Sequence, residues 1–515
     1  MKTSSDFLWR LIQSMSTAEK LFFKRNLAHT GDKGKAIYKK LFDAIAGQSG
    51  YDEQQLLKKL EPAVNRKNLS FTKNYLQKQI TEALVQHDSK NSVSQKIFNQ
   101  IQLIRIYRQK GMTEEAHALW KKSVKYGREY EKFGLLGLLK NEFEKIVLFS
   151  NLHTRYDDMH QIFQKRLISY EEYSNLMTLR DMYSETLLLK RSAHFDFDDR
   201  MKDRITEMLD FINNMGELPY GKSFWFRHYY RMNKGTLLYL QNKISASLPI
   251  FLECWQDWKK NSQFIKEDGE FYIELLNMIN YAGIIQHEYA KVEDILNNDL
   301  NELIGEQSQR ANFEVVKFLA LNKIFNKTAN YKKVEKLLVS MKEGIAKWEP
   351  VLNDDLNLTI HVSLGIGCFV LDQYSESLNH LKKAAQLCRV GTRKDLAATT
   401  HILLLLVTYS MNNSKLFDAQ YRATYAWFYK YKNKHIYESA LVQCLHRSFY
   451  MPDMKNKLAE YKETLEILAA HRDDDVQQQT FNIFNFEGWL ISRIQRTTYR
   501  QYVEGKVKQE AVLVN

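Results

Sequence analysis

The chain has 515 residues, of which 44% are hydrophobic and 26% are charged; these are the proportions of a folded protein, and they exclude disorder throughout. A chain of this length must divide into domains or form a repeat array. The 20 glycines and 5 prolines are too few for the turns of a β-rich protein, so we expect an all-α fold, and the net charge of +13 suggests an anionic partner.

Residues 1–90 predict a small helical unit. Ser16 and Glu19 form a capping box, in which each side chain satisfies a free backbone amide at the start of a helix. Apolar periodicity then predicts helices over 35–46, from Asp52 to just before Pro62, and over 69–86. Residues 15–24 and 38–45 resemble the leader segment of bacterial repeat proteins of uncharacterised function, and this resemblance implies no activity.

The basic charge is concentrated in this N-terminal unit. Residues 1–90 carry 13 lysines and 3 arginines against 9 acidic residues, which gives a net charge of +7. A density of this kind is compatible with contacts to phosphate, although a solvated helix face has the same composition. The candidate anion-binding residues are Lys20, Lys24, Arg25, Lys39 and Lys40.

Internal self-similarity begins after residue 91. The first copy of the pattern predicts two helices joined by a turn at Gly111, which cross where a small residue, Ala116, allows close approach. We expect the residues of this code to make the contacts between the two helices: Leu103, Tyr107, Gly111, Ala116, Trp120 and Ser123.

The same code recurs along the chain, most clearly at Leu364, Gly365, Tyr374, Ser377, Leu381 and Ala384. The predicted crossing positions lie 42 to 46 residues apart. They are Ala116, Met159, Met201, Ser247, Val292, Val334, Ser377, Ala419 and Tyr461. A fixed period of this size is typical of a helical repeat protein.

On these two copies the chain resembles the tetratricopeptide-like helical repeats, although its period is longer than the 34 residues of that family. The resemblance implies an α-solenoid of eight or nine helical hairpins with a concave groove that binds a peptide or protein segment. We therefore divide the chain into a basic helical unit (1–90), a repeat array (91–475) and a C-terminal capping helix and tail (476–515). The apolar helix near residues 481–494 could cap the array or form a dimer contact, and the oligomeric state is left open.

One aromatic helix face is a candidate for the groove, because it corresponds to the groove side of the first helix in a tetratricopeptide hairpin. Ordinary core packing would give the same pattern. The candidate groove-binding residues are Trp225, Tyr229, Met232, Thr236 and Tyr239.

The sequence carries no motif for catalysis, a cofactor or a metal. Phosphate-binding loops, dinucleotide motifs and nucleophile elbows are absent, so we predict that the protein is not an enzyme and has no catalytic residue, no cofactor and no metal site. The four cysteines are far apart in the sequence, which predicts that they are buried thiols in a reducing compartment. They are Cys254, Cys368, Cys388 and Cys444. The longest aliphatic run, 402–407, is far shorter than the roughly 20 residues that span a bilayer, so we expect a cytoplasmic protein without membrane insertion.

Two functions fit this architecture. The first is a non-catalytic scaffold or adaptor that holds a protein or peptide partner in the groove. The alternative is a regulator in which residues 1–90 contact the phosphates of a nucleic acid and the repeats bind a partner. The two differ in salt dependence, because phosphate contacts release counterions.

Overall fold

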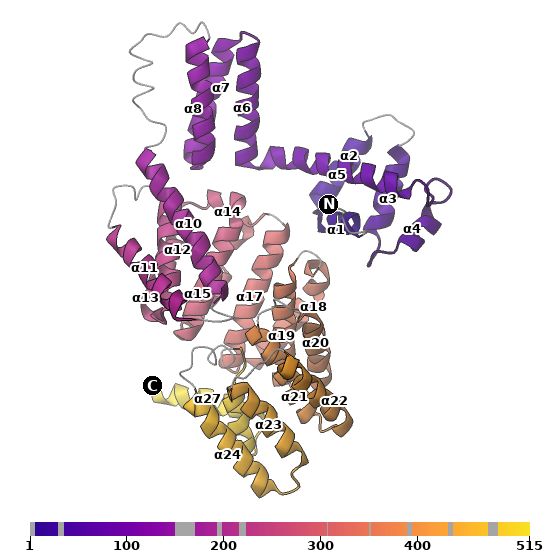
Figure 1. Ribbon diagram of the computed structural model, residues 1–515, viewed down its shortest axis with the longest axis vertical. Helices are drawn as coiled ribbons and strands as arrows, with labels where there is room; N and C mark the ends of the chain where they lie inside the picture. Colours follow the sequence, from indigo (N-terminus) through magenta and orange to yellow (C-terminus); the bar gives the residue numbers. More distant parts are fainter. Residues whose placement is uncertain are drawn as a thin grey trace.

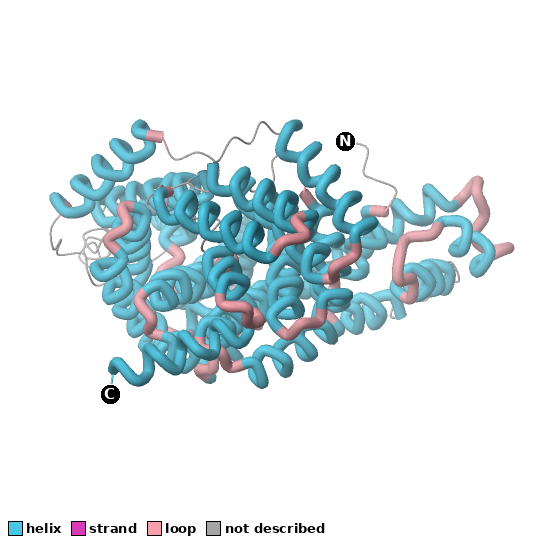
Figure 2. The backbone as a smooth tube through the Cα atoms, turned by 90° about the horizontal axis from the view of Figure 1, so that it is seen from below, coloured by secondary structure: helices cyan, strands magenta, loops and turns pink. Residues whose placement is uncertain are grey.

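The computed structural model describes residues 6–28, 35–149, 170–192, 198–215, 223–305, 307–349, 352–388, 394–430, 436–471 and 483–514. Within these ranges the regular elements are α-helices and one short 3-10 helix, and no strand occurs (Figure 2). Figure 1 shows a long succession of antiparallel helix pairs, with a smaller helical unit set to one side near the N-terminus. The predicted all-α solenoid is therefore confirmed.

The N-terminal unit has five helices: α1 (Phe7–Ser14), α2 (Thr17–Ala28), α3 (Lys35–Ala46), α4 (Glu53–Leu60) and α5 (Leu69–Asn91). The capping box is formed as predicted, since the Ser16 backbone N–H donates to Glu19 Oε2 at 2.7 Å and the Glu19 N–H donates to Ser16 Oγ at 3.2 Å. Helix α1 was not predicted. The buried residues of the unit, among them Phe42 and Ile80, form a hydrophobic cluster of their own, and α5 leads directly into the array (Figure 1).

The array consists of consecutive helix pairs. The first helices of the pairs are α6 (Val93–Gln109), α8 (Phe133–Phe149), α10 (Tyr170–Ser192), α12 (Phe224–Leu240), α15 (Gly269–Ile285), α17 (Gln307–Lys327), α19 (Asp354–Val370), α21 (Lys394–Ser410) and α23 (Ile436–Tyr450). The second helices are α7 (Thr113–Glu129), α11 (Asp199–Asn214), α13 (Ile244–Lys260), α16 (Tyr289–Leu296), α18 (Tyr331–Trp348), α20 (Tyr374–Leu387), α22 (Ser414–Lys430) and α24 (Met454–Ala470). Shorter elements, α14 (Gln263–Glu267) and η1 (Asp299–Leu303), lie between pairs.

Most predicted crossing positions are confirmed. The buried ones, each on the second helix of a pair, are Ala116, Ser247, Val292, Val334, Ser377 and Tyr461. At the pair α19–α20 the approach is so close that Ser377 Oγ donates to the Gly365 carbonyl oxygen at 2.7 Å, and a Cβ added at Gly365 would lie 2.6 Å from Leu381. A small residue on each helix is what this close crossing requires.

Two crossing positions were wrong, and one lies outside the described residues. Ala419 is exposed, because the neighbouring Phe417 fills the interface of α22 instead. Met201 is only half-buried, and Ile205 occupies the corresponding place on α11. Met159 falls in the range that the structure does not describe.

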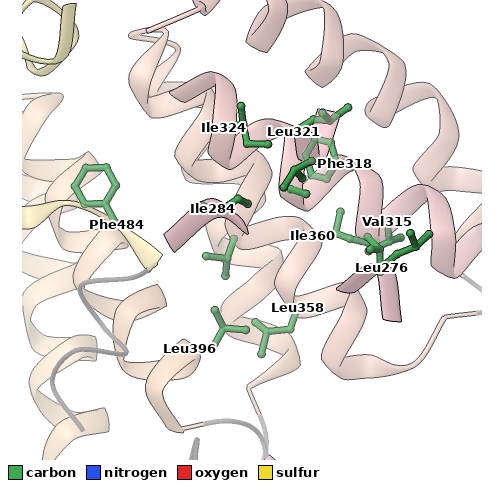
Figure 3. Close-up of a cluster of buried hydrophobic side chains, with 14 of the residues drawn as sticks. Leu276, Ile284, Val315, Phe318, Leu321, Ile324, Leu358, Ile360, Leu396 and Phe484 are labelled. Carbon is green, nitrogen blue, oxygen red and sulfur yellow. The ribbon is translucent and has the colours of Figure 1, made fainter. Parts of the chain in front are cut away.

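One large hydrophobic core runs from α10 to the C-terminal segment, while the buried residues of α11 form a smaller cluster with Met182 and Leu237. The large core joins Leu276 of α15, Phe318 of α17, Ile360 of α19 and Leu396 of α21 (Figure 3). The first helices are buried around much of their circumference, and on α21 each of residues 396–408 is buried. Helices α6–α8 instead have a separate core, built around residues such as Trp120 and Phe143.

The C-terminal segment packs back onto the array. Helix α26 (Phe486–Ile494) lies against α24, and α27 (Tyr499–Val514) follows it. The Phe484 ring lies 5.7 Å from that of Phe369, and the Arg500 guanidinium lies 4.8 Å from the centre of the Tyr331 ring. This segment therefore packs on the last helix pair, and it also reaches back to the C-terminal end of α19 and the N-terminal end of α18. Its role as a cap stays a prediction.

All four cysteines are free thiols, and burial raises the pKa of each of them. None of the helices in the described ranges combines the length and the apolar character that crossing a bilayer requires.

Candidate functional site

The predicted groove residues lie on α12, between α10 and α15 (Figure 1). Trp225, Tyr229, Met232 and Thr236 are buried, and Tyr239 is half-buried. Rings from both neighbouring helices close over this face: Tyr183 of α10 lies 5.6 Å and Phe271 of α15 lies 5.9 Å from the Tyr229 ring. These four side chains thus pack between helices, and the expectation that they face a ligand does not agree with the structure.

Polar contacts hold the same three helices together. Thr186 Oγ1 of α10 donates to Asn233 Oδ1 at 2.9 Å, and Lys190 Nζ pairs with Glu274 Oε1 of α15 at 2.5 Å. Burial raises the pKa of Tyr229 to about 12, so its hydroxyl stays neutral. The inner face at α10, α12 and α15 is a closed interface rather than an open groove.

The predicted anion-binding residues lie on α2 and α3 of the N-terminal unit. Lys24 Nζ forms a 2.6 Å ion pair with Asp43, so its charge is already compensated. Lys20 is half-buried, and burial followed by repulsion from Lys24 lowers its pKa. Arg25, Lys39 and Lys40 are exposed, and anion binding at these three stays a prediction.

A pocket of about 720 Å³ opens elsewhere on this unit, between α1, α4 and α5. Its floor is apolar, with Leu57 and Leu69, and its wall carries Glu53 and Lys73. The Lys73 ammonium donates to the Tyr51 hydroxyl at 2.6 Å and to Glu53 at 3.3 Å, so its hydrogen bonds are taken within the protein. None of the five predicted cations lines this pocket.

The turn between α7 and α8 joins the first repeats to the rest of the array. Glu131, which has a left-handed backbone (φ 47°), accepts the backbone N–H groups of Phe224 and Trp225 at 2.8 and 3.0 Å and the Ser223 hydroxyl at 2.8 Å. Beside it, Lys132 pairs with Asp268 at 2.9 Å. Glu131 therefore caps the N-terminus of α12, although it lies more than 90 residues earlier in the sequence. Its carboxylate also complements the helix dipole at that end.

A second contact of the same kind links α6 to the C-terminal end of α14. The Val93 backbone N–H donates to Glu267 Oε1 at 2.8 Å. The apolar part of the junction is small: the Tyr130 ring lies 6.3 Å from Phe264, and Phe133 packs nearby. Among the described residues, the contacts between α6–α8 and the main array lie at one end of these helices and are mainly polar.

The outer side of α6 carries an exposed apolar surface. Ile97, Ile101 and Ile104 point into the local core. Outside this buried arc of the helix, Phe98 and Ile106 are each 42% exposed and Leu103 is 41% exposed. We call these three residues the α6 face. A helix with apolar residues on two sides ordinarily has neighbours on both, and here one side has none within the described residues.

The charged side chains of α6 itself are all basic, while Glu114 and Glu115 begin the neighbouring helix α7. Helix α6 contains Lys96, Arg105 and Arg108 and no acidic residue, and Lys110 follows it. Arg105 pairs with the buried Glu142 of α8 at 2.6 Å, while Lys96 and Lys110 take part in no ion pair within the described residues. The α6 face therefore suits a surface that brings carboxylates together with apolar side chains.

Sequence reasoning missed this face because it assigned Leu103 to the contact between α6 and α7. The structure gives that role to Ile104, which is fully buried, while Leu103 faces outward. The signal was present in the sequence, since Phe98, Leu103 and Ile106 fall outside the arc of helix surface defined by Ile97, Ile101 and Ile104.

No group of three His, Cys, Asp or Glu side chains within the described part of the chain is arranged to hold a metal ion. No protein-family model matches the sequence, and no curated protein matches it. Among solved structures, the chain is similar to the crystal structure of the apo form of RapI, with 12% sequence identity and a TM-score of 0.44. That match covers 81% of this chain and 98% of the RapI chain.

Proposed function

We propose that the protein is a non-catalytic interaction scaffold whose α6 face docks an acidic, amphipathic helix of a partner protein. The observation that carries the proposal is the pairing of three exposed apolar side chains with an entirely basic set of charges on one helix. Amphipathic helices recognise such surfaces through anchors at i, i+3 and i+4 spacing.

The energetic argument rests on burial. Covering Phe98, Leu103 and Ile106 removes apolar surface from water, at roughly 25 cal/mol per Å². Carboxylates on the partner would lie near Lys96 and Lys110, which speeds association and selects against basic partners. Since the inner helices of the main array pack closely on one another, an exposed outer face is a better docking site here than the predicted groove.

The test is quantitative capture of proteins from lysate of the source cell, after nuclease treatment, with the full chain and two variants. Ile106→Asp places a negative charge opposite the partner's carboxylates. The repulsion should reduce the amount of captured partner at least ~10-fold. Val339→Asp is the matched control, because Val339 is an exposed apolar residue on the outer side of α18.

The two variants must also unfold at the same temperature, which shows that a difference in capture does not come from a difference in folding. If Ile106→Asp and Val339→Asp retain the same proteins, docking on the α6 face is wrong. If the captured partner has no acidic amphipathic segment, the proposed docking of an acidic helix is wrong, but the role as a scaffold is not contradicted.

A further inference from the structure

A strip of aromatic side chains lies on the outer surface formed by α22 and α23. Tyr421, Tyr425 and Tyr429 follow one another at i, i+4 and i+8 on α22, and His446 and Tyr450 continue the strip on α23. We call these five residues the tyrosine strip. Neighbouring rings are separated by 6.3 Å (Tyr421 to Tyr425), 3.8 Å (Tyr421 to His446) and 5.7 Å (His446 to Tyr450).

One end of the strip is fixed by its surroundings. Tyr421 stacks on His446 with nearly parallel rings, and the Tyr450 hydroxyl donates to Asp418. Beneath it, Phe417 stacks on Phe449 at 4.0 Å. These contacts hold the base of the strip in place, which reduces the entropy lost when a ligand binds.

The other end of the strip is open to solvent. Tyr425 is 60% exposed and Tyr429 is 81% exposed. Ala426, next to Tyr425, is small and exposed, whereas Trp427 and Phe428 are half-buried. Most of both side chains is therefore in contact with solvent, and residues i and i+4 lie ~6 Å apart along the helix axis. Large aromatic rings left in water over such a length indicate a binding surface.

The charge of α22 differs from that of the other second helices. Its exposed charged residues are Lys415, Arg422 and Lys430, and its one acid, Asp418, is half-buried. Each of the other second helices in the described residues exposes at least one acid, such as Glu376 on α20. The ligand of this surface is therefore negatively charged as well as able to stack.

From this geometry we infer that the tyrosine strip binds a single-stranded nucleic acid, with bases stacked on Tyr425 and Tyr429 and phosphates beside Arg422 and Lys430. Rows of aromatic rings interleaved with cations are how proteins bind single strands without reading their sequence. A duplex offers no free base faces for this stacking. A polyanion matches this surface better than a protein surface of mixed charge, because the exposed charged residues of α22 are all basic.

The experiment is fluorescence anisotropy of a labelled 20-nucleotide oligothymidylate, titrated with the full chain. We expect binding at low salt, and the double variant Tyr425→Ala/Tyr429→Ala should weaken it at least ~10-fold. Tyr425→Phe/Tyr429→Phe keeps the rings and should bind nearly as well as the original chain. Arg422→Glu should reduce the dependence of log K on log salt by about one.

Two controls separate this site from others. Phe71→Ala removes an exposed ring from the N-terminal unit and should leave binding unchanged. Lys39→Glu/Lys40→Glu tests the basic N-terminal unit, and loss of binding in that variant alone would overturn the proposal. Absence of binding, or equal binding by the alanine double variant, would also overturn it. The proposal would also be wrong if the variant Tyr425→Ala/Tyr429→Ala still bound the oligonucleotide but no longer captured a protein that the full chain captures.

Discussion

Helices α6–α8 and the array from α10 onward are built from the same kind of antiparallel helix pair, yet they are held by different forces. From α10 to α26, one large core joins the first helices of successive pairs, and Figure 3 shows the part of it between α15 and α21. The core of α6–α8 is separate, and the junction depends on Glu131, Lys132 and Glu267 with a small apolar contact at Tyr130. In a repeat protein, stability is a sum of repeat and interface contributions, so cooperativity should break where the interface is polar.

The largest expected effect comes from emptying each core in turn. Phe251→Ala removes a fully buried ring that packs on Gly235, and it should lower the free energy of unfolding by about 3–5 kcal/mol. Phe143→Ala is the matched change in the α6–α8 core. Denaturant unfolding followed by hydrogen exchange should show that Phe251→Ala weakens the array as a whole, whereas Phe143→Ala weakens residues 93–149 alone. A single transition shifted equally by both variants would show that the two regions unfold as one.

Acid should act on the large core through His228. This histidine is buried on α12, where Trp258 Nε1 donates to its Nδ1 at 3.2 Å, and burial lowers its pKa to about 3. Below its ordinary value of 6.5 the unfolded chain binds a proton that the folded chain does not. Stability should therefore be highest above pH 6.5 and fall toward pH 3, by up to about 1.4 kcal/mol per pH unit.

Denaturant midpoints at pH 7.5 and pH 5.0 measure this slope. His228→Gln should make the slope shallower by the share of one proton, because burial also lowers the pKa of His380 and of His401 to about 4. His287→Asn, a change at an exposed histidine, is the control. An unchanged slope in His228→Gln would assign the acid sensitivity to other groups.

A smaller effect is expected at the junction. Glu131→Gln keeps the shape of the side chain but removes the charge that caps α12, at a cost of about 1–2 kcal/mol. Hydrogen exchange at residues 223–226 should rise, while the cores on both sides keep their protection. Glu129→Gln is the control, because Glu129 is exposed on the same turn. Equal exchange in the two variants would mean that Glu131 does not hold the regions together.

The repeat period could be predicted because it depends on local contacts within each pair. Small or apolar residues at Ala116, Ser247 and Ser377 reveal where two helices cross, and those positions are buried. The copy at Ala419 failed because Phe417, two residues earlier, fills the same interface. A period of about 43 residues tolerates such a shift without changing the fold.

The sites were harder to predict because they depend on contacts between pairs. Tyr229 and Met232 have the composition of a binding face, but α10 and α15 close over them, and the sequence of α12 does not reveal how tightly the array curves. The exposure of Leu103 has the same origin, since only the three-dimensional arrangement shows which side of α6 lacks a neighbour. At the N-terminus, the pairing of Lys24 with Asp43 likewise joins two helices.

The return of the C-terminal segment to the middle of the array limits how this protein can change in evolution. An open solenoid gains or loses a repeat with little consequence, because each unit touches only its neighbours. Here Phe484 meets Phe369 and Arg500 meets Tyr331, so the span between these partners sets a definite number of pairs. Insertion or deletion of one pair after α19 would carry the C-terminal helices past their partners, and duplication is therefore tolerated only on the N-terminal side of α17.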